Sequence, residues 1–239
     1  MYKEKIDRFI SYFTQELELI DTISNDRKYK VHKKALYLSF IDAFSGVVYP
    51  AKSNRKRFVS LVLEFGNWEY SEYISTPHLA KLLKLNPDPK YSKLRKFTFK
   101  NYDKWSDGDL IFLNNDLQSK DVEKLWPNGK DYKEPINGIK FESLKHCNLL
   151  YSYRNSIIHE FRPFGTDAQF SDDQNPYYFN IMDLDDENRN YWSLIYPTHF
   201  FYVLANTILK NVEKYFIENR IDPIEIVMSG NYWLKGLNK

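Results

Sequence analysis

LYSYRNSIIHEFRPFG, residues 150–165, places an arginine, an asparagine and a histidine within a turn and a half of a run that is otherwise typical of a buried helix. Asn155 and His159 lie four residues apart and share one face of that helix. At about 100° per residue, Arg154 points into the middle of an adjacent apolar arc, which consists of Leu144, Cys147, Leu150, Tyr151, Ile157, Ile158 and Phe161. Burying an unpaired guanidinium costs several kcal/mol. The arc is therefore predicted to meet something charged, polar or wet at the level of Arg154.

The helix that carries this stretch is predicted over residues 139–161, because apolar residues recur at helical spacing up to its end. Arg162-Pro163-Phe164-Gly165 then ends the helix and turns the chain. The last long helix of the chain is predicted over residues 197–219, where a proline stands at its start and a long apolar stripe follows.

The amino-terminal part of the chain is predicted to contain two further long helices. Residues 2–23 carry apolar side chains at three-and-four spacing with charges on the other face. Residues 24–28 are polar and rich in capping residues, so they are expected to be a connection. Residues 31–48 are apolar nearly all round, which indicates a central position in the fold.

Residues 51–137 carry weaker signals and are expected to be an insertion that packs on the main body, since no linker of flexible composition sets them apart. Turn-forming residues multiply between 86 and 137, where only short helical pieces are expected. The helices predicted within the insertion cover residues 55–65, 78–85 (with Thr76 and Pro77 at its start) and 120–126.

A small β-hairpin is predicted just before the last long helix. Residues 177–182 and 191–196 are rich in aromatic and branched residues, and the polar segment 183–190 between them is expected to be its turn. The predicted fold class is therefore mainly α. It is an antiparallel helical bundle that forms one domain over residues 1–239, with the packed insertion, and with the motif helix, hairpin and last helix in residues 138–220.

Composition limits where and how such a protein works. Of the 239 residues, 43% are hydrophobic and 17% aromatic, which is ample for a core. The net charge of +2 gives no global field toward nucleic acid or membrane, so any polyanion site must be local. The single cysteine, Cys147, lies in an apolar helical pattern and argues against a disulfide scaffold and against a thiolate metal cluster. With no signal peptide and no membrane-spanning apolar run in the sequence, a soluble, cytoplasmic protein is expected.

The run Arg154-Asn155-Ser156-Ile157-Ile158-His159, near the carboxyl end of a long helix, resembles the R-x4-6-H signature of the HEPN superfamily, in which a polar residue commonly follows the arginine. The resemblance implies a helical bundle that dimerises so that two such helices face each other. Many members are metal-independent endoribonucleases, including toxins of toxin–antitoxin systems and abortive-infection proteins. The motif covers six residues, and the supporting helices extend the resemblance loosely over residues 1–50 and 138–220.

RNA cleavage without a metal needs a base for the 2′-hydroxyl, an acid for the leaving 5′-oxygen and positive charge near the phosphorus. Histidine can transfer protons near neutral pH, and arginine matches phosphate oxygens with a planar fork of donors. By resemblance, Arg154 stabilises the phosphate, His159 transfers protons and Asn155 orients one of them. Glu160 and His146 are possible supporting residues. A homodimer, a 2′,3′-cyclic phosphate product and no metal or cofactor are expected.

The resemblance also has limits within this sequence. Arg27 and His32 satisfy the same spacing, but they are expected at a connection between helices, with lysine in second position and without an apolar frame, so they are interpreted as a coincidence. Some family toxins carry H-x-Y and are silenced by nucleotidylation of that tyrosine. Here Phe161 stands at that place, so the resemblance does not imply this control.

Two classes of function remain open from the sequence. One is a homodimeric endoribonuclease of anti-phage defence or stress response, acting on an RNA substrate and paired with an antitoxin or other regulatory partner. The other is a non-catalytic helical module that binds protein or RNA, in which Arg154 and His159 make structural hydrogen bonds. Basic clusters at 52–57 and 90–104 offer phosphate contacts to either, but a solvated face with local core also explains them, and the near-neutral net charge favours that interpretation. His78, His146 and His199 are expected in surface or core roles.

Overall fold

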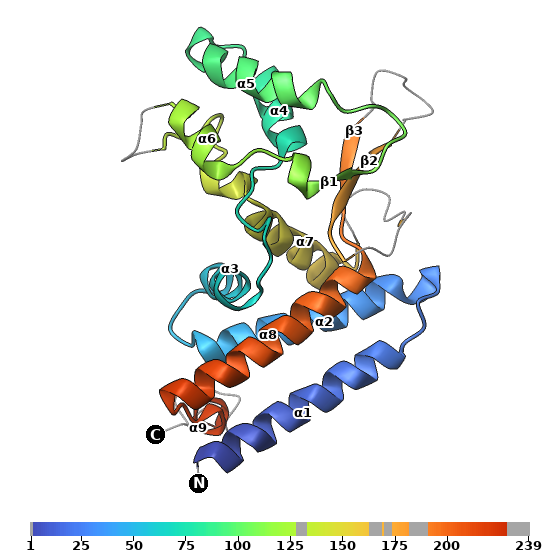
Figure 1. Ribbon diagram of the computed structural model, residues 1–239, viewed down its shortest axis with the longest axis vertical. Coiled ribbons are helices and arrows are strands. Elements are labelled where there is room, and N and C mark those ends of the chain that lie inside the picture. Colours follow the sequence, from blue (N-terminus) through green and yellow to red (C-terminus); the bar gives the residue numbers. More distant parts are fainter. Residues whose placement is uncertain (1, 128–132, 163–168, 170–173, 182–190, 229–239) are drawn as a thin grey trace. The chain divides into compact units, whose positions relative to one another are not determined.

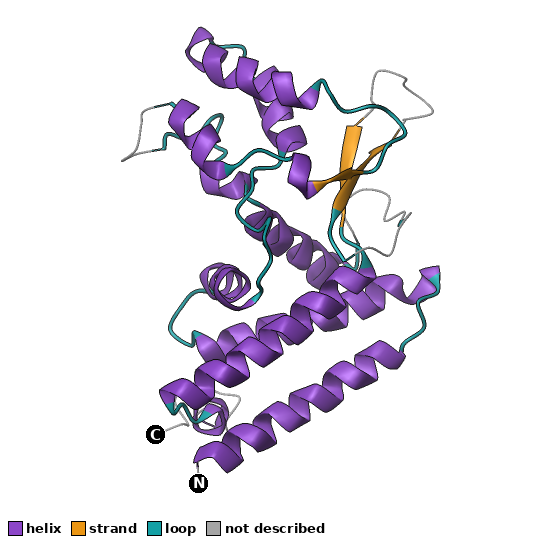
Figure 2. Cartoon of the chain, viewed as in Figure 1, coloured by secondary structure: helices purple, strands orange, loops and turns teal. Residues whose placement is uncertain are grey.

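The computed structural model describes residues 2–127, 133–162, 169, 174–181 and 191–228. These residues are mainly helical, with a small three-stranded antiparallel sheet, and this confirms the predicted fold class (Figure 2). The chain divides into two compact units: unit 1 consists of residues 1–68 and 201–239, and unit 2 of residues 69–200. No described helix is both long enough and apolar enough to cross a membrane.

Unit 1 is built from both ends of the chain. In Figure 1, α1 and α2 are consecutive helices joined by a short connection, and residues of α1 also contact α9. Asn211 of α8 donates its side-chain amide to the carbonyl oxygen of Phe65 at 2.8 Å, which ties α8 to the end of α3. The helices of this unit are α1 (Tyr2–Thr22), α2 (Arg27–Val48), α3 (Asn54–Phe65), most of α8 (Thr198–Asn219) and α9 (Pro223–Met228).

Aromatic rings form the centre of unit 1. Phe44 is fully buried on α2, and its ring centroid lies 4.6 Å from that of Phe13 and 5.7 Å from that of Phe9, both on α1. Phe9 in turn meets Phe216 of α8 edge-on at 6.0 Å. Offset and edge-on rings at such separations contribute attraction beyond their buried area. This packing explains why α2 carries apolar residues nearly all round.

Unit 2 is made of shorter elements around a small sheet. The strands lie in the order β1-β2-β3, all antiparallel, and Phe179 pairs with Ser193 across β2 and β3. The two predicted hairpin strands are thus β2 and β3, while the predicted turn at 183–190 lies outside the described residues. The elements are α4 (Thr76–Lys84), α5 (Ser92–Tyr102), β1 (Ile111–Phe112), α6 (Ser119–Leu125), α7 (His146–Glu160), β2 (Tyr177–Ile181) and β3 (Tyr191–Ile195).

The motif helix is shorter than the sequence predicts. Instead of starting at residue 139, α7 starts at His146, and a 3-10 turn at Phe141–Leu144 is separated from it by Lys145 in an extended conformation. The backbone N–H of His146 donates to the carbonyl of Tyr73 at 3.1 Å, and the carbonyl of Leu144 accepts from Ser75 N at 3.0 Å. These two hydrogen bonds to a segment about 70 residues earlier in the chain satisfy backbone groups that a continuous helix would have bonded internally.

Two other helices differ from expectation. α2 begins at Arg27, so the predicted connection at 24–28 is shorter and the second R-x4-H sequence lies inside the first turns of a helix. α5 is a helix of 11 residues where only short pieces are expected. Its apolar signal is weak because only Leu94 and Thr98 are buried, and lysines alternate with its partly exposed aromatic residues.

Replacing Phe44 by alanine is expected to lower the free energy of unfolding by roughly 3–5 kcal/mol, because the vacated space lies among rings that cannot all move inward. The matched control is Tyr29→Ala on the same helix, where the ring is 40% exposed and the cost should stay below about 1 kcal/mol. Denaturant unfolding followed by far-ultraviolet circular dichroism measures both, and equal losses would contradict the assigned core.

Candidate functional site

The last turns of α7 bring Arg154, Asn155 and His159 together. Nη1 of Arg154 donates to Oδ1 of Asn155 at 3.0 Å and lies 3.2 Å from Nε2 of His159. The Arg154 residue is only 9% exposed, whereas His159 is exposed and Asn155 is half-buried. One mostly buried cation thus contacts an imidazole on the surface, and the three residues that the motif predicts form one hydrogen-bonded cluster.

The contact with Arg154 determines which ring nitrogen of His159 accepts a hydrogen bond. A guanidinium can only donate, so His159 accepts through the lone pair of Nε2 and its ring proton is on Nδ1. A neutral exposed imidazole beside a fixed cation can accept a proton from a hydroxyl group, and the cation can bind an oxyanion close to it.

The backbone after His159 is tied back to the helix. Phe161 takes the left-handed conformation with φ 49° and ends α7, and its own N–H donates to Ser156 O. The Ser156 hydroxyl donates to the carbonyl of Arg162. Glu160 is exposed and bonds Arg162 Nη2 at 2.9 Å, so the structure pairs this carboxylate with Arg162. These contacts give the last helical turn a defined end.

His146 does not join the motif cluster. It is the first residue of α7, fully buried, and its Nε2 lies 2.7 Å from Oδ2 of Asp116. Arg154 follows eight residues later, about 12 Å along the helix axis at 1.5 Å per residue. A role of His146 in the buried interior agrees with the sequence interpretation, and a supporting role beside Arg154 does not agree with this position.

Asp116 is the centre of a buried polar network in unit 2. Its Oδ1 accepts from the backbone N–H of Thr76, the first residue of α4, at 2.8 Å. Its Oδ2 accepts from the Tyr178 hydroxyl at 2.9 Å and contacts His146. The Tyr178 hydroxyl also lies 2.7 Å from Oγ of the buried Ser75. Burial raises the pKa of Tyr178 well above its ordinary value, so the phenol stays protonated.

The network continues from Ser75 to a histidine at the surface. Ser75 Oγ lies 2.7 Å from Nδ1 of His78, which follows it by one turn of α4. His78 is partly accessible to solvent, yet desolvation by the surrounding protein lowers its pKa to about 4, with the nearby His146 contributing in the same direction. At neutral pH His78 is therefore uncharged.

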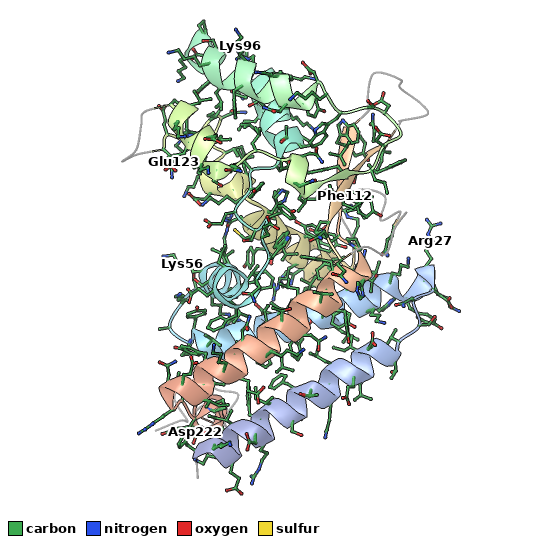
Figure 3. All side chains as sticks on the ribbon, in the orientation of Figure 1. Arg27, Lys56, Lys96, Phe112, Glu123 and Asp222 are labelled. Carbon is green, nitrogen blue, oxygen red and sulfur yellow. The ribbon has the colours of Figure 1, made fainter. Side chains whose placement is uncertain are left out.

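The second R-x4-H sequence and the single cysteine lie outside both polar clusters. Arg27 and His32 lie in the first turns of α2 and are exposed, and the Arg27 side chain extends away from its helix (Figure 3). Burial raises the pKa of the Cys147 thiol to about 11, so it is protonated at neutral pH. Within the part of the chain that the structure describes, no three His, Cys, Asp or Glu side chains gather in a way that could hold a metal ion.

No family model, curated protein or solved structure matches this chain.

Sequence reasoning finds the Arg154 cluster but misses the network around Asp116. Ser75 and His78 flank Thr76-Pro77, a segment that already predicts a helix start, and serine at such a position can bond a side chain three residues on. The spacing of Ser75 and His78 could therefore have predicted their contact. The link to Asp116 and Tyr178 spans 40 to 103 residues, and no spacing rule predicts contacts over such separations.

Replacing His78 by asparagine is expected to flatten the loss of stability in acid. Between pH 6.5 and about 4, the unfolded chain binds a proton at this position and the folded chain does not, so the free energy of unfolding falls as the pH falls through that window. We expect a contribution of about 1 kcal/mol, reduced from the full value because one side of the ring is solvated. Urea unfolding at several pH values measures the slope, with His32→Asn as the matched control. Equal slopes in the two variants would contradict the assignment.

Proposed function

We propose that the protein is a metal-independent endoribonuclease of the HEPN type that acts as a homodimer. The observation that supports this most is the contact of 3.2 Å between Nη1 of the buried Arg154 and Nε2 of the exposed His159, with Asn155 on the same guanidinium nitrogen. These are the residue types that cleavage at a ribose 2′-hydroxyl needs, and they are held together at one end of a helix.

The proposed reaction begins with displacement of a hydrogen bond. A phosphate oxygen is a stronger acceptor for a guanidinium than a neutral imidazole nitrogen, so a bound phosphate group takes the Arg154 donor. Nε2 of His159 is then free to accept the proton of the adjacent 2′-hydroxyl. The 2′-oxygen attacks phosphorus and the P–O5′ bond breaks, which leaves a 2′,3′-cyclic phosphate and, after protonation, a 5′-hydroxyl. Arg154 stabilises the charge that develops on the phosphorane oxygens.

The leaving 5′-oxygen needs a proton from a second group, because His159 already holds the one that it removed. A second copy of the chain, related by a two-fold axis, brings its own His159 to the same phosphate. That imidazole has lost its bond from Arg154 and taken a proton from solvent, and it donates this proton to the leaving oxygen as the acid. This arrangement makes the site a shared one. A biological role in anti-phage defence, or in a toxin–antitoxin or stress response with an antitoxin or regulatory partner, forms part of the proposal.

Exposed lysines on α5 support an RNA substrate. Lys93, Lys96 and Lys100 are spaced three and four residues apart and are all exposed, so they share one face of the helix. Lys96 is labelled on α5 in Figure 3. Lysines on one face can contact successive phosphates of a strand without reading its sequence.

A non-catalytic helical module that binds protein or RNA is the second candidate. The contacts of Arg154 favour this candidate as well, because its guanidinium already has two acceptors on its own helix, Asn155 and His159. Such bonds could serve only to stabilise the last turns of α7. The two candidates differ in whether His159 is needed for chemistry.

His159→Ala is expected to reduce cleavage of single-stranded RNA by at least about a hundredfold, because it removes the proton-transfer group. Cleavage by the unaltered protein should persist in excess EDTA, yield a cyclic phosphate terminus detectable by mass spectrometry, and fail on a substrate with 2′-O-methyl groups. The matched control is His32→Ala, which alters the other R-x4-H sequence and should cut normally. Equal cleavage by the His159 and His32 variants would refute the mechanism, and loss of cleavage in EDTA would refute metal independence.

The shared site makes a further quantitative prediction. When unaltered protein is mixed with His159→Ala protein and the subunits are allowed to exchange, the activity per total protein should fall with the square of the unaltered fraction, because only dimers with two His159 residues are fully active. A site complete in one chain gives a linear fall instead. Sedimentation velocity run in parallel shows whether a dimer is present, and a monomer that cleaves RNA would contradict the two-fold arrangement.

A further inference from the structure

Unit 2 contains a cavity of about 350 Å³ that neither the motif cluster nor the proposed mechanism uses. It lies against α7, β3 and the start of α4, and its volume falls in the range of small-molecule sites. Trp192 forms part of its wall and is held edge-on against Trp105 at 5.3 Å. The lining that matters here consists of His78, Ser152, Tyr153, Tyr191, Trp192 and Tyr196.

The aromatic side chains give the cavity flat apolar walls. Tyr153 and Tyr196 are both buried and contact each other with ring centroids 4.8 Å apart, so their positions are fixed by packing. Tyr191 also lines the cavity and is 45% exposed, so part of this residue is accessible to a ligand. Flat heteroaromatic groups stack on such rings, and a stacked base contributes about 1–3 kcal/mol.

The cavity also presents one oriented polar group. Nδ1 of His78 is bonded to Ser75, which is fully buried, and His78 lines the cavity, so we infer that Nε2, on the opposite side of the ring, is the nitrogen that a ligand meets. The Ser75 hydroxyl can donate to Nδ1 or accept from it, depending on which way the Tyr178 proton points. Nε2 can therefore act as a donor or as an acceptor toward a ligand.

The charges around the cavity restrict the ligand. Its described lining contains no lysine, arginine, aspartate or glutamate. A phosphate group would find no cationic side chain there, whereas an uncharged ring with donors and acceptors on its edge would fit. We propose that this cavity binds a nucleobase, stacked on its aromatic wall and hydrogen-bonded at its edge by His78.

The position of the cavity on α7 relates it to the motif cluster. Ser152 lines the cavity, and His159 follows seven residues later, nearly two full turns, so both lie on the same side of the helix about 10 Å apart along its axis. A base in the cavity can thus belong to a strand whose phosphate lies at His159, or to a free nucleotide. The first source rests on the proposed nuclease function, and the second does not.

The test uses Ser152→Leu, which fills the cavity from an exposed helical position, and Ser92→Leu as the matched control at an exposed position of α5 away from the cavity. The probes are the four nucleoside monophosphates, ribose 5-phosphate as the ligand without a base, and a fluorescent 2′-O-methyl RNA that cannot be cleaved. Calorimetry and fluorescence anisotropy measure binding. Ser152→Leu should weaken binding at least tenfold for a base-containing probe, while Ser92→Leu leaves it unchanged.

Two further variants separate the hydrogen bond from the shape of the cavity. An asparagine amide reaches about as far as Nδ1 and a glutamine amide about as far as Nε2. His78→Asn keeps a partner for Ser75 and removes the group that faces the ligand, so it should weaken binding several-fold and alter the preference among the four bases. His78→Gln should restore part of the loss. Equal binding by both variants and the unaltered protein would overturn the role of His78.

The outcomes distinguish this proposal from the nuclease. Binding of monophosphates that Ser152→Leu abolishes supports a free-nucleotide site, and an effect on the RNA probe alone supports a base within a strand. If the protein cuts no RNA but still binds a base in this way, the cavity assignment holds and the nuclease fails. If His159-dependent cleavage holds while Ser152→Leu and Ser92→Leu bind every probe equally, or if no probe with a base binds better than ribose 5-phosphate, the cavity assignment is wrong.

Discussion

The carboxylate of Asp116 is the constraint on which unit 2 depends. It is 7% exposed, and it accepts hydrogen bonds from the first residue of α4 and from Tyr178 on β2, and contacts the first residue of α7. A buried carboxylate needs all these partners, because each one lost leaves charge uncompensated in a poorly polarisable interior. The first residues of α4 and α7 and the second residue of β2 are thereby held at the carboxylate of Asp116. The start of α7 sets where Arg154 and His159 lie, since a helix carries its register from its first turn to its last.

The buried guanidinium of Arg154 finds its acceptors closer in sequence than the apolar arc suggests. The apolar arc predicts that the guanidinium must meet an anion, an acceptor or water. Two acceptors are on the same helix, at Asn155 and His159, and they reach the same nitrogen. The cost of removing a cation from water is thus partly offset within six residues of chain. This is also why the motif is recognisable in sequence: all the groups that define it are local.

Local signals account for most of what the sequence could predict. Helical periodicity predicted α1 and α3, and runs of aromatic and branched residues predicted β2 and β3. The motif predicted the cluster at the end of α7. The break before His146 could not be predicted, because it depends on backbone hydrogen bonds to residues 71–75, far away in sequence. The same holds for Asp116, a single carboxylate in an irregular segment that owes its importance to partners up to 62 residues away.

The division of the chain into units has a consequence for synthesis on the ribosome. Unit 2 is one continuous segment, residues 69–200, whereas unit 1 needs residues 1–68 together with residues 201–239. Lys5 of α1 is bonded to Asp222, 217 positions later. As domains generally fold as units while the chain emerges, unit 2 can complete its core first, and α1 to α3 must wait with exposed aromatic residues for α8. The aromatic residues of α1 and α2 that pack against α8 are therefore fully buried only after α8 has left the ribosome.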